Sequence, residues 1–534
     1  MTNSLKRASF LLWLLAIAAF AILHAFHLRA DFPNHSPWSG DYAKYTDEGW
    51  YSNAAVRAQL SGNWYLPGDF NPAPAVPVWP FLEWILFFFT GVSVQAARAL
   101  AVSIFFVNLL LSYLLLRARG SPWMALLALT LLVTSPFLFC FSRLAILEPL
   151  LIAVLLAALN IAVRLDRIRR PVAAAALVGV LFTLAVLTKT TAVFLLPALV
   201  WAIAAARWPD RNCVFRCLAW AAAASAATFG AWMNAVIRAG LLRDFTYFFF
   251  VNSYPKPHSV YWPAVSLWWA FHGGLWADRV LFPLAGLVTL AVALCWRFPR
   301  ARKLARDPVF GASILAVAGY LLFMTWQYHP QPRYFTVVAH FSFFVLVIGA
   351  ETLLAAQPGP VFASAPATRV NWPRLAGAVA VATCCVMAIA NGIWTFEYAA
   401  HPQYTWSSAA AALTRYIDQH PNGNRLLVSI SGAQITLMTR LPSLCDDFGT
   451  VKLPQKLARY RPGWWATWND IDPRVLAALH VHYSLEQVAS FRALDNPDRN
   501  VLVLFKLHPL AHDRAPGPAL EQPLPGDKIN IELQ

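Results

Sequence analysis

Long apolar runs separated by short polar segments make up the first three quarters of the chain. The runs recur from Phe10 to Trp394, and their length of about 18–25 residues is what an α-helix needs to cross the hydrocarbon core of a bilayer. Residues 1–396 are therefore expected to form an α-helical, polytopic membrane domain. They predict about 11 membrane-spanning helices, near residues 9–28, 97–116, 122–140, 145–163, 172–188, 190–206, 214–237, 279–296, 309–326, 334–355 and 374–395.

The composition and the charge pattern agree with this interpretation. Hydrophobic residues make up 58% and charged residues only 13% of the 534 residues, which is about half of the charged share of a soluble domain. Basic residues gather in the loops after alternate spans, for example between Arg164 and Arg170 and between Arg300 and Arg306, and such loops stay in the cytoplasm. The net charge of +16 therefore reflects membrane topology, and we expect no nucleic-acid partner.

One apolar stretch, Val78–Phe89, is expected not to cross the membrane. It is short for a span, contains Glu83 and follows a proline-rich entry. We predict a helix that lies in the membrane interface, with Trp79 and Trp84 as aromatic anchors. Residues 29–96 then form a large first external loop with interfacial helices.

The chain beyond residue 396 has a different pattern. Strand-like runs at Arg425–Ile430 and Asn500–Lys506 alternate with helix-like runs at Ser408–Gln419 and Pro473–Leu479. This alternation predicts a small, soluble α/β domain over residues 397–534, on the same external side as the first loop.

Two sets of acidic residues are candidates for chemistry. Asp47 and Glu48, in the first external loop, stand before a helix-like segment; they either cap that helix or act as a general base or metal ligand at the membrane surface. Glu148 lies about one turn inside the outer end of a span, and a charge at the centre of such a helix costs ~2.5–3.5 kcal/mol. It is either half of a structural ion pair with Arg143 or a functional acid.

Three cations interrupt the topology pattern. Arg143, Lys189 and Arg333 lie at the external ends of hairpins, where the positive-inside rule disfavours them. Each alone is explained as a residue that extends its charge to the interface. Three at one level, beside a loop rich in carboxylates, predict an anion site that suits a polyprenyl phosphate headgroup.

In this order the segments resemble the GT-C superfamily of membrane glycosyltransferases, above all the dolichyl-phosphate-mannose-protein mannosyltransferase-like group and the aminoarabinose transferases that modify lipid A. The lipid A-modifying enzymes have an acidic-basic pair where this chain has Asn71-Pro72-Ala73-Pro74, so the resemblance leaves the sugar open. The matching segments are Thr46 to Tyr51, Ser61 to Pro67, the interfacial helix up to Gly91, Ala96 to Arg98, Leu144 to Pro149, Thr188-Lys189 and Pro332 to Tyr334.

The resemblance implies a role for each candidate residue. Asp47 is implied as the catalytic carboxylate with Glu48 beside it, and Glu148 as a second acid of the site. Lys189 and Arg333 are implied to bind the lipid phosphate. The remaining residues that we place in the substrate site are Arg143, Tyr51 and Tyr334.

We therefore predict a glycosyltransferase of the hexosyl or pentosyl transferase class. It would move a sugar from a polyprenyl-phosphate donor to a lipid, glycan or protein acceptor on the external, periplasmic face of the cell inner membrane. Asp47 would act as general base in an inverting displacement. No cofactor is required; a divalent cation would have Asp47, Glu48 and Glu148 as ligands. The alternatives are a transporter or lipid flippase, whose path the intramembrane charges would mark, and a non-catalytic scaffold acting through residues 400–534.

Overall fold

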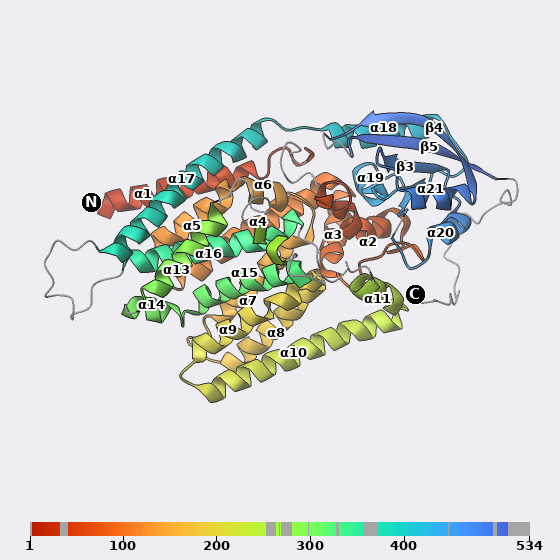
Figure 1. The fold of residues 1–534 in the computed structure, drawn as a ribbon. Helices are drawn as coiled ribbons and strands as arrows, with labels where there is room; N and C mark the ends of the chain where they lie inside the picture. The colour runs from red at the N-terminus through yellow and green to blue at the C-terminus, as the bar shows by residue number, and fades with distance from the viewer. Residues whose placement is uncertain are drawn as a thin grey trace, which may run out of the picture.

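The protein consists of a bundle of long apolar helices with a small sheet domain against one end of it (Figure 1). The segment predicted as the first external loop, with helices α2 (Asp47–Ser61) and α3 (Val78–Thr90), lies between the two parts (Figure 1). The computed structural model describes residues 3–31, 41–251, 263–265, 267–268, 280–296, 298–326, 331–355, 371–446, 448–494 and 499–510.

The helical membrane fold is confirmed. Among the described residues, seven helices are long and apolar enough to cross a membrane, or eight if the bent pair α5–α6 is one span. The shorter helices α1, α7 and α13 lie at three more of the predicted spans, and the total of about 11 remains a prediction. The bundle comprises α1 (Asn3–Leu23), α4 (Val94–Arg117), α5 (Pro122–Thr134), α6 (Pro136–Ser142), α7 (Leu147–Ala162), α8 (Pro171–Thr188), α9 (Leu196–Arg207), α10 (Arg211–Arg238), α13 (Leu281–Leu294), α15 (Pro308–Trp326), α16 (Phe335–Leu354) and α17 (Trp372–Ala400).

The bundle is built around one buried helix, and a glycine allows two of its outer helices to pack closely. Helix α16 is the central element, with 89% of its span buried, and α5, α13, α15 and α17 pack around it. Helix α10 packs mainly against α8, with smaller contacts to α9, and most of its span is exposed. A side chain at Gly179 of α8 would come within 1.9 Å of the Ala221 carbonyl oxygen. Glycine therefore allows the two backbones to approach closely, which is how helices associate in lipid.

The predicted span over residues 122–140 is broken. Helices α5 and α6 meet at an angle of 66° at Ser135-Pro136. Pro136 has no N–H to donate and its ring disrupts the preceding turn, while the Ser135 hydroxyl accepts a hydrogen bond from the Leu138 N–H and so caps a new helix. An apolar run of the right length predicted one span here because apolar residues continue on both sides of the proline.

Helix α3 has 13 residues, too few to span a bilayer. Its outward face carries Phe88 and Phe89, which are 71% and 78% exposed, and such a face fits a helix lying in the membrane interface. The prediction that Trp79 is an interfacial anchor is wrong, because Trp79 is fully buried. It lies on the same buried face as Glu83, whose carboxylate accepts a hydrogen bond from Ser52 of α2 at 2.7 Å.

The C-terminal part is a small α/β domain, as predicted. Its five-stranded sheet has the order β2-β1-β3-β5-β4, in which β1 pairs in parallel with β2 and β3, and β5 is antiparallel to β3 and β4. Residues 511–534 of the predicted domain lie outside the described residues. The elements are α18 (Thr405–Gln419), β1 (Leu427–Val428), α19 (Gly432–Thr439), β2 (Ser443–Leu444), α20 (Leu453–Tyr460), β3 (Trp464–Trp468), α21 (Pro473–His480), β4 (Tyr483–Arg492) and β5 (Val501–Pro509).

Candidate active site

Four of the predicted site residues lie at, or directly next to, the ends of helices. Asp47 is the first residue of α2, and Glu148 is the second residue of α7. Lys189 has an extended backbone between α8 and the short helix η2 (Thr190–Leu195). Arg333 is in the turn η4 (Pro332–Tyr334), directly before α16. The ends of four separate helices thus bring the charged side chains together, so that none of them has to lie in the middle of a membrane-spanning helix.

Three ion pairs, two on Arg333 and one on Lys189, form the centre of this cluster. Arg333 Nη2 lies 2.9 Å from Asp47 Oδ2, and its Nη1 lies 2.6 Å from Asp41 Oδ1. Lys189 Nζ lies 2.7 Å from Glu148 Oε1. The ring of Tyr334 connects the pairs, because Lys189 and Arg333 lie 4.5 and 4.9 Å from its centroid, within the range of cation–π attraction.

The cluster is closed to solvent, and part of its hydrogen-bonding capacity is unused. Asp47, Glu148, Lys189 and Arg333 are at most 4% exposed. Glu148 Oε2 and Arg333 Nε have no hydrogen-bond partner among the described residues. A buried polar atom without a partner is costly, so both atoms are available to a ligand.

The environment of Asp47 suits a base. Burial raises the pKa of Asp47, while the Arg333 guanidinium opposes the rise. A carboxylate in water is a weak base near neutral pH, and a raised pKa makes proton abstraction more favourable. The hydroxyl of Thr46 donates to Asp47 Oδ1 at 3.1 Å and fixes the direction of the carboxylate.

Tyr51 lies one turn after Asp47 on α2 and therefore on the same helix face. Burial, and then the charge of Asp47, raise the pKa of Tyr51. The structure thus brings together Asp47, Tyr51, Glu148, Lys189, Arg333 and Tyr334.

Glu48, predicted beside Asp47 in the catalytic set, points into a different network. Its carboxylate accepts hydrogen bonds from Arg98 Nε at 2.7 Å, from Arg98 Nη2 at 2.6 Å and from the Ala145 N–H at 2.9 Å. Gln434 Nε2 donates to it as well, at 3.0 Å. These contacts use both carboxylate oxygens, and they are those of a structural residue.

Arg143 also lies apart from the cluster. Its guanidinium donates to the carbonyl oxygens of Phe26 and His27 at 2.5 and 2.9 Å and covers the Phe139 ring. The prediction offered Arg143, five residues before Glu148, as the other half of a structural ion pair. Arg143 instead lies between the end of α6 at Ser142 and the start of α7 at Leu147, and Lys189 is the ion-pair partner of Glu148.

The predicted metal ligands do not gather. No three His, Cys, Asp or Glu side chains come together as a metal site in the part of the chain that the structure describes. Asp47 and Glu148 each have a cationic partner, and Glu48 belongs to the Arg98 network.

Two residues of the site were not singled out from the sequence. Asp41 is the second carboxylate on Arg333 and also accepts a hydrogen bond from the Arg333 N–H at 2.8 Å. Its presence in the acid-rich run before α2 was the only available signal. Gln434 comes from the C-terminal domain and has no sequence signal at all, because only the tertiary fold brings it to α2.

An apolar cavity of about 570 Å³ lies between α3, α8 and α10. Its wall includes Leu187, two residues before Lys189. The lining is suited to a hydrocarbon chain rather than to a sugar. Residues that define it are Trp64, Pro77, Phe81, Leu187, Trp232 and Leu241.

Asn71 donates a hydrogen bond to Asp244 at 3.3 Å. It belongs to the segment Asn71 to Pro74, which has no acidic-basic pair. Burial raises the pKa of Asp244 to about 6, although Asn71 opposes the rise. Because the folded state then holds the proton more tightly than the unfolded state, the contribution of Asp244 to stability is present below about pH 4 and is lost as the pH rises through about 6.

Asp244→Asn should therefore stabilise the protein at pH 7.5, by roughly 1–2 kcal/mol because the carboxyl is partly solvated, and should have little effect at pH 4. Thermal unfolding of both proteins at the two pH values measures this. Asp418→Asn, at an exposed ion pair with Arg425, is the matched control. The same difference at both pH values would contradict the assignment.

Comparison with known proteins finds a family model that matches part of the sequence. Residues 41–230 match the family model described as dolichyl-phosphate-mannose-protein mannosyltransferase. No curated protein matches the chain.

Solved structures match over most of the chain. ArnT from Cupriavidus metallidurans, bound to undecaprenyl phosphate, is 16% identical, with a TM-score of 0.60 over 94% of this chain and 99% of that one. Its apo state gives a TM-score of 0.57 at the same identity and coverage. The oligosaccharyltransferase AglB from Archaeoglobus fulgidus gives 0.49 at 12% identity, over 96% of this chain and 75% of its own. The chain is thus a multi-pass membrane protein with the fold of ArnT, and the predicted resemblance to the dolichyl-phosphate-mannose-protein mannosyltransferase family is confirmed over residues 41–230.

Proposed function

We propose that this protein is a glycosyltransferase that moves a sugar from a polyprenyl-phosphate donor to an acceptor hydroxyl on the periplasmic face of the inner membrane. The observation that carries the proposal is the buried cluster of Asp47, Glu148, Lys189 and Arg333. It combines a carboxylate whose environment suits a base with two cations that suit a phosphate. The ArnT fold, solved with undecaprenyl phosphate bound, supports an enzyme rather than a transporter or a scaffold.

The reaction is a single displacement. Asp47 takes the proton of the acceptor hydroxyl, the oxygen attacks the anomeric carbon, and the bond from that carbon to the phosphate oxygen breaks on the opposite face, which inverts the configuration. The electron pair of the broken bond remains on the polyprenyl phosphate. Since the leaving group is already an anion, Lys189 and Arg333 stabilise it by charge and no general acid or cofactor is needed.

The ion pairs imply an order of events. Arg333 holds Asp47 and Asp41 at the same time, and a donor phosphate competes with these carboxylates for the guanidinium. When the phosphate engages Arg333, it weakens the hold on Asp47 and leaves that carboxylate available to the acceptor. Donor binding therefore precedes activation of the base.

The apolar cavity offers a place for the hydrocarbon tail. The cavity next to Leu187 has apolar walls and begins two residues from Lys189. A tail lying there would contact Leu187, two residues before Lys189 in the chain. This arrangement supports a lipid-linked donor over a soluble nucleotide sugar.

The test uses the full chain in lipid vesicles with a panel of radiolabelled undecaprenyl-phosphate sugars and membrane lipids as acceptors. We expect one donor to be consumed, with release of undecaprenyl phosphate and transfer of label. Movement of intact donor across the bilayer without cleavage would indicate a flippase. Consumption of none of the donors would count against the proposal.

A further inference from the structure

Three acidic residues of the first external loop bind the C-terminal domain. Asp31 caps the start of α18, where Oδ2 accepts hydrogen bonds from the Trp406 N–H at 2.9 Å and from the Thr405 hydroxyl at 2.8 Å. Asp69 and Glu48 contact the domain at two further points. The loop that carries Asp47 is thus attached to the domain along its length.

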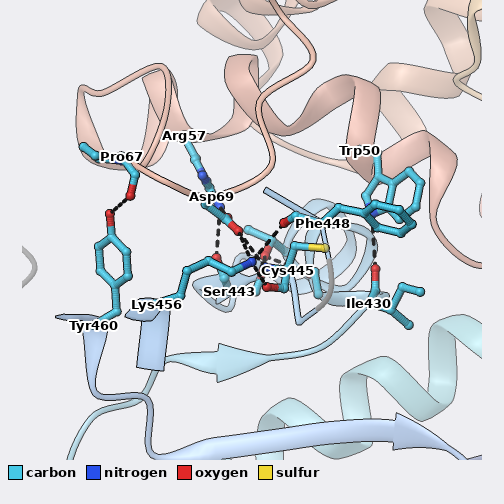
Figure 2. Close-up of polar contacts among 12 residues, drawn as sticks. Trp50, Arg57, Pro67, Asp69, Ile430, Ser443, Cys445, Phe448, Lys456 and Tyr460 are labelled. Carbon is cyan, nitrogen blue, oxygen red and sulfur yellow. Dashed lines mark hydrogen bonds and ion pairs between the residues drawn. The ribbon is translucent and has the colours of Figure 1, made fainter. Parts of the chain in front are cut away.

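The contact at Asp69 is a buried ion-pair network (Figure 2). Asp69 lies 2.6 Å from Arg57 Nη2 and 3.3 Å from Lys456 Nζ, and it accepts the Cys445 N–H at 3.1 Å. Lys456 also donates to the Cys445 and Phe448 carbonyl oxygens. Because Asp69 and Lys456 are fully buried, separating the domain from the loop would leave costly uncompensated charges. The domain is therefore firmly docked.

The contact at Gln434 reaches the residue beside the proposed base. Gln434 Oε1 accepts a hydrogen bond from the Gly49 N–H at 2.7 Å, and Nε2 donates to Glu48 at 3.0 Å. A side chain at position 49 would come within 2.1 Å of the Gln434 backbone nitrogen, so the approach of α19 to α2 requires glycine there.

Gln434 replaces the usual cap of α2. In a capped helix the side chain of the N-cap residue accepts the N–H of the second or third helical residue. Here the N-cap residue is Thr46, whose side chain makes no such bond; its hydroxyl donates to Asp47. The N–H of Gly49, the third residue of α2, is satisfied by Gln434 instead.

The same network continues to the other acid of the site. Glu48, held by Gln434, accepts from Arg98 of α4 and from the Ala145 N–H. Ala145 lies in the turn that leads into α7, three residues before Glu148. One connected set of hydrogen bonds thus fixes both the first turn of α2, with Asp47, and the entry to α7, with Glu148.

We infer that Gln434 is a positioning residue through which the C-terminal domain sets Asp47 against Arg333. The inference rests on the proposed function and gives the C-terminal domain a part in it. The domain would thus help to position the catalytic carboxylate.

The test compares Gln434→Ala with Tyr460→Phe in the full chain. Tyr460→Phe removes another hydrogen bond between the domain and the loop, from the Tyr460 hydroxyl to the Pro67 carbonyl oxygen at 2.6 Å, at a place remote from α2's first turn (Figure 2). Hydrogen–deuterium exchange should increase at the peptide containing Gly49 in Gln434→Ala only. With the donor that the wild type consumes, Gln434→Ala should lower kcat by about 10–100-fold, since a displacement of ~1 Å in an active site has such effects, with KM for the donor little changed.

The outcomes separate the two proposals. Raised exchange at Gly49 with unchanged kcat, or an equal loss of kcat in Tyr460→Phe, overturns the positioning role. A wild type that consumes no donor counts against the proposed function, while the exchange measurement still tests the attachment. If Gln434→Ala does not fold, Gln434→Glu preserves the volume and the acceptor for Gly49 but repels Glu48. It should lower kcat while the Gly49 peptide stays protected; unchanged kcat in this variant contradicts the inference.

Discussion

Asp47→Asn is expected to lower kcat for sugar transfer by about 10²–10⁴-fold, the contribution of a placed general base. The amide retains the size of the carboxylate, and its oxygen can still accept the hydrogen bond from the Thr46 hydroxyl, so the fold should persist. It cannot take a proton from the acceptor. Transfer of label from the donor, measured under single-turnover conditions in vesicles, gives the rate.

The same variant should not lose affinity for undecaprenyl phosphate. Arg333 loses one of its two carboxylate partners, so a phosphate competes for the guanidinium at least as well as before. Asp418→Asn, an exposed substitution of the same kind, should behave as wild type in both assays. Equal transfer by the Asp47→Asn and wild-type proteins would rule out Asp47 as the base.

Lys189→Met is expected to have the second large effect, on both stability and binding. The substitution leaves the buried Glu148 carboxylate without its partner at 2.7 Å, and breaking a buried pair in this way costs ~3–5 kcal/mol. Thermal unfolding should show the loss as a much lower transition temperature. Binding of undecaprenyl phosphate should weaken as well, because one of the two cations is gone.

The double variant Glu148→Gln/Lys189→Met separates the two effects. With both charges removed, most of the lost stability should return, but weak phosphate binding should remain. Lys452→Met, at an exposed lysine of the C-terminal domain, is the control for loss of a positive charge. Recovery of phosphate binding in the double variant would show that Lys189 is only the structural partner of Glu148.

The helical bundle was predictable because the length of an apolar run directly measures its ability to cross a bilayer. The break at Pro136 was missed because both halves are equally apolar, so hydropathy does not register the bend. Trp79 was assigned to the interface by residue type. Its position on the face of α3 that packs against α2 decides its burial, and that depends on tertiary structure.

The candidate site was predictable where charge conflicted with topology. Lys189 and Arg333 stood out because cations at external helix ends oppose the positive-inside pattern, and the structure brings them to Asp47 and Glu148. Arg143 met the same criterion but lies elsewhere, since spacing along the chain does not give direction in space. Gln434 is uncharged and lies 386 positions from Glu48 and 385 positions from Gly49 along the chain. No local sequence pattern could connect residues so far apart.

The attachment of Asp31, Glu48 and Asp69 to residues beyond 400 has a consequence for biosynthesis. A ribosome adds about 5–20 residues per second, so the first loop emerges about 20–80 s before the segment that completes it. Until then its acids lack their partners in the C-terminal domain, and contacts of such large sequence separation form slowly. The loop that carries Asp47 is therefore among the first parts of the protein to be made and among the last to acquire its native contacts.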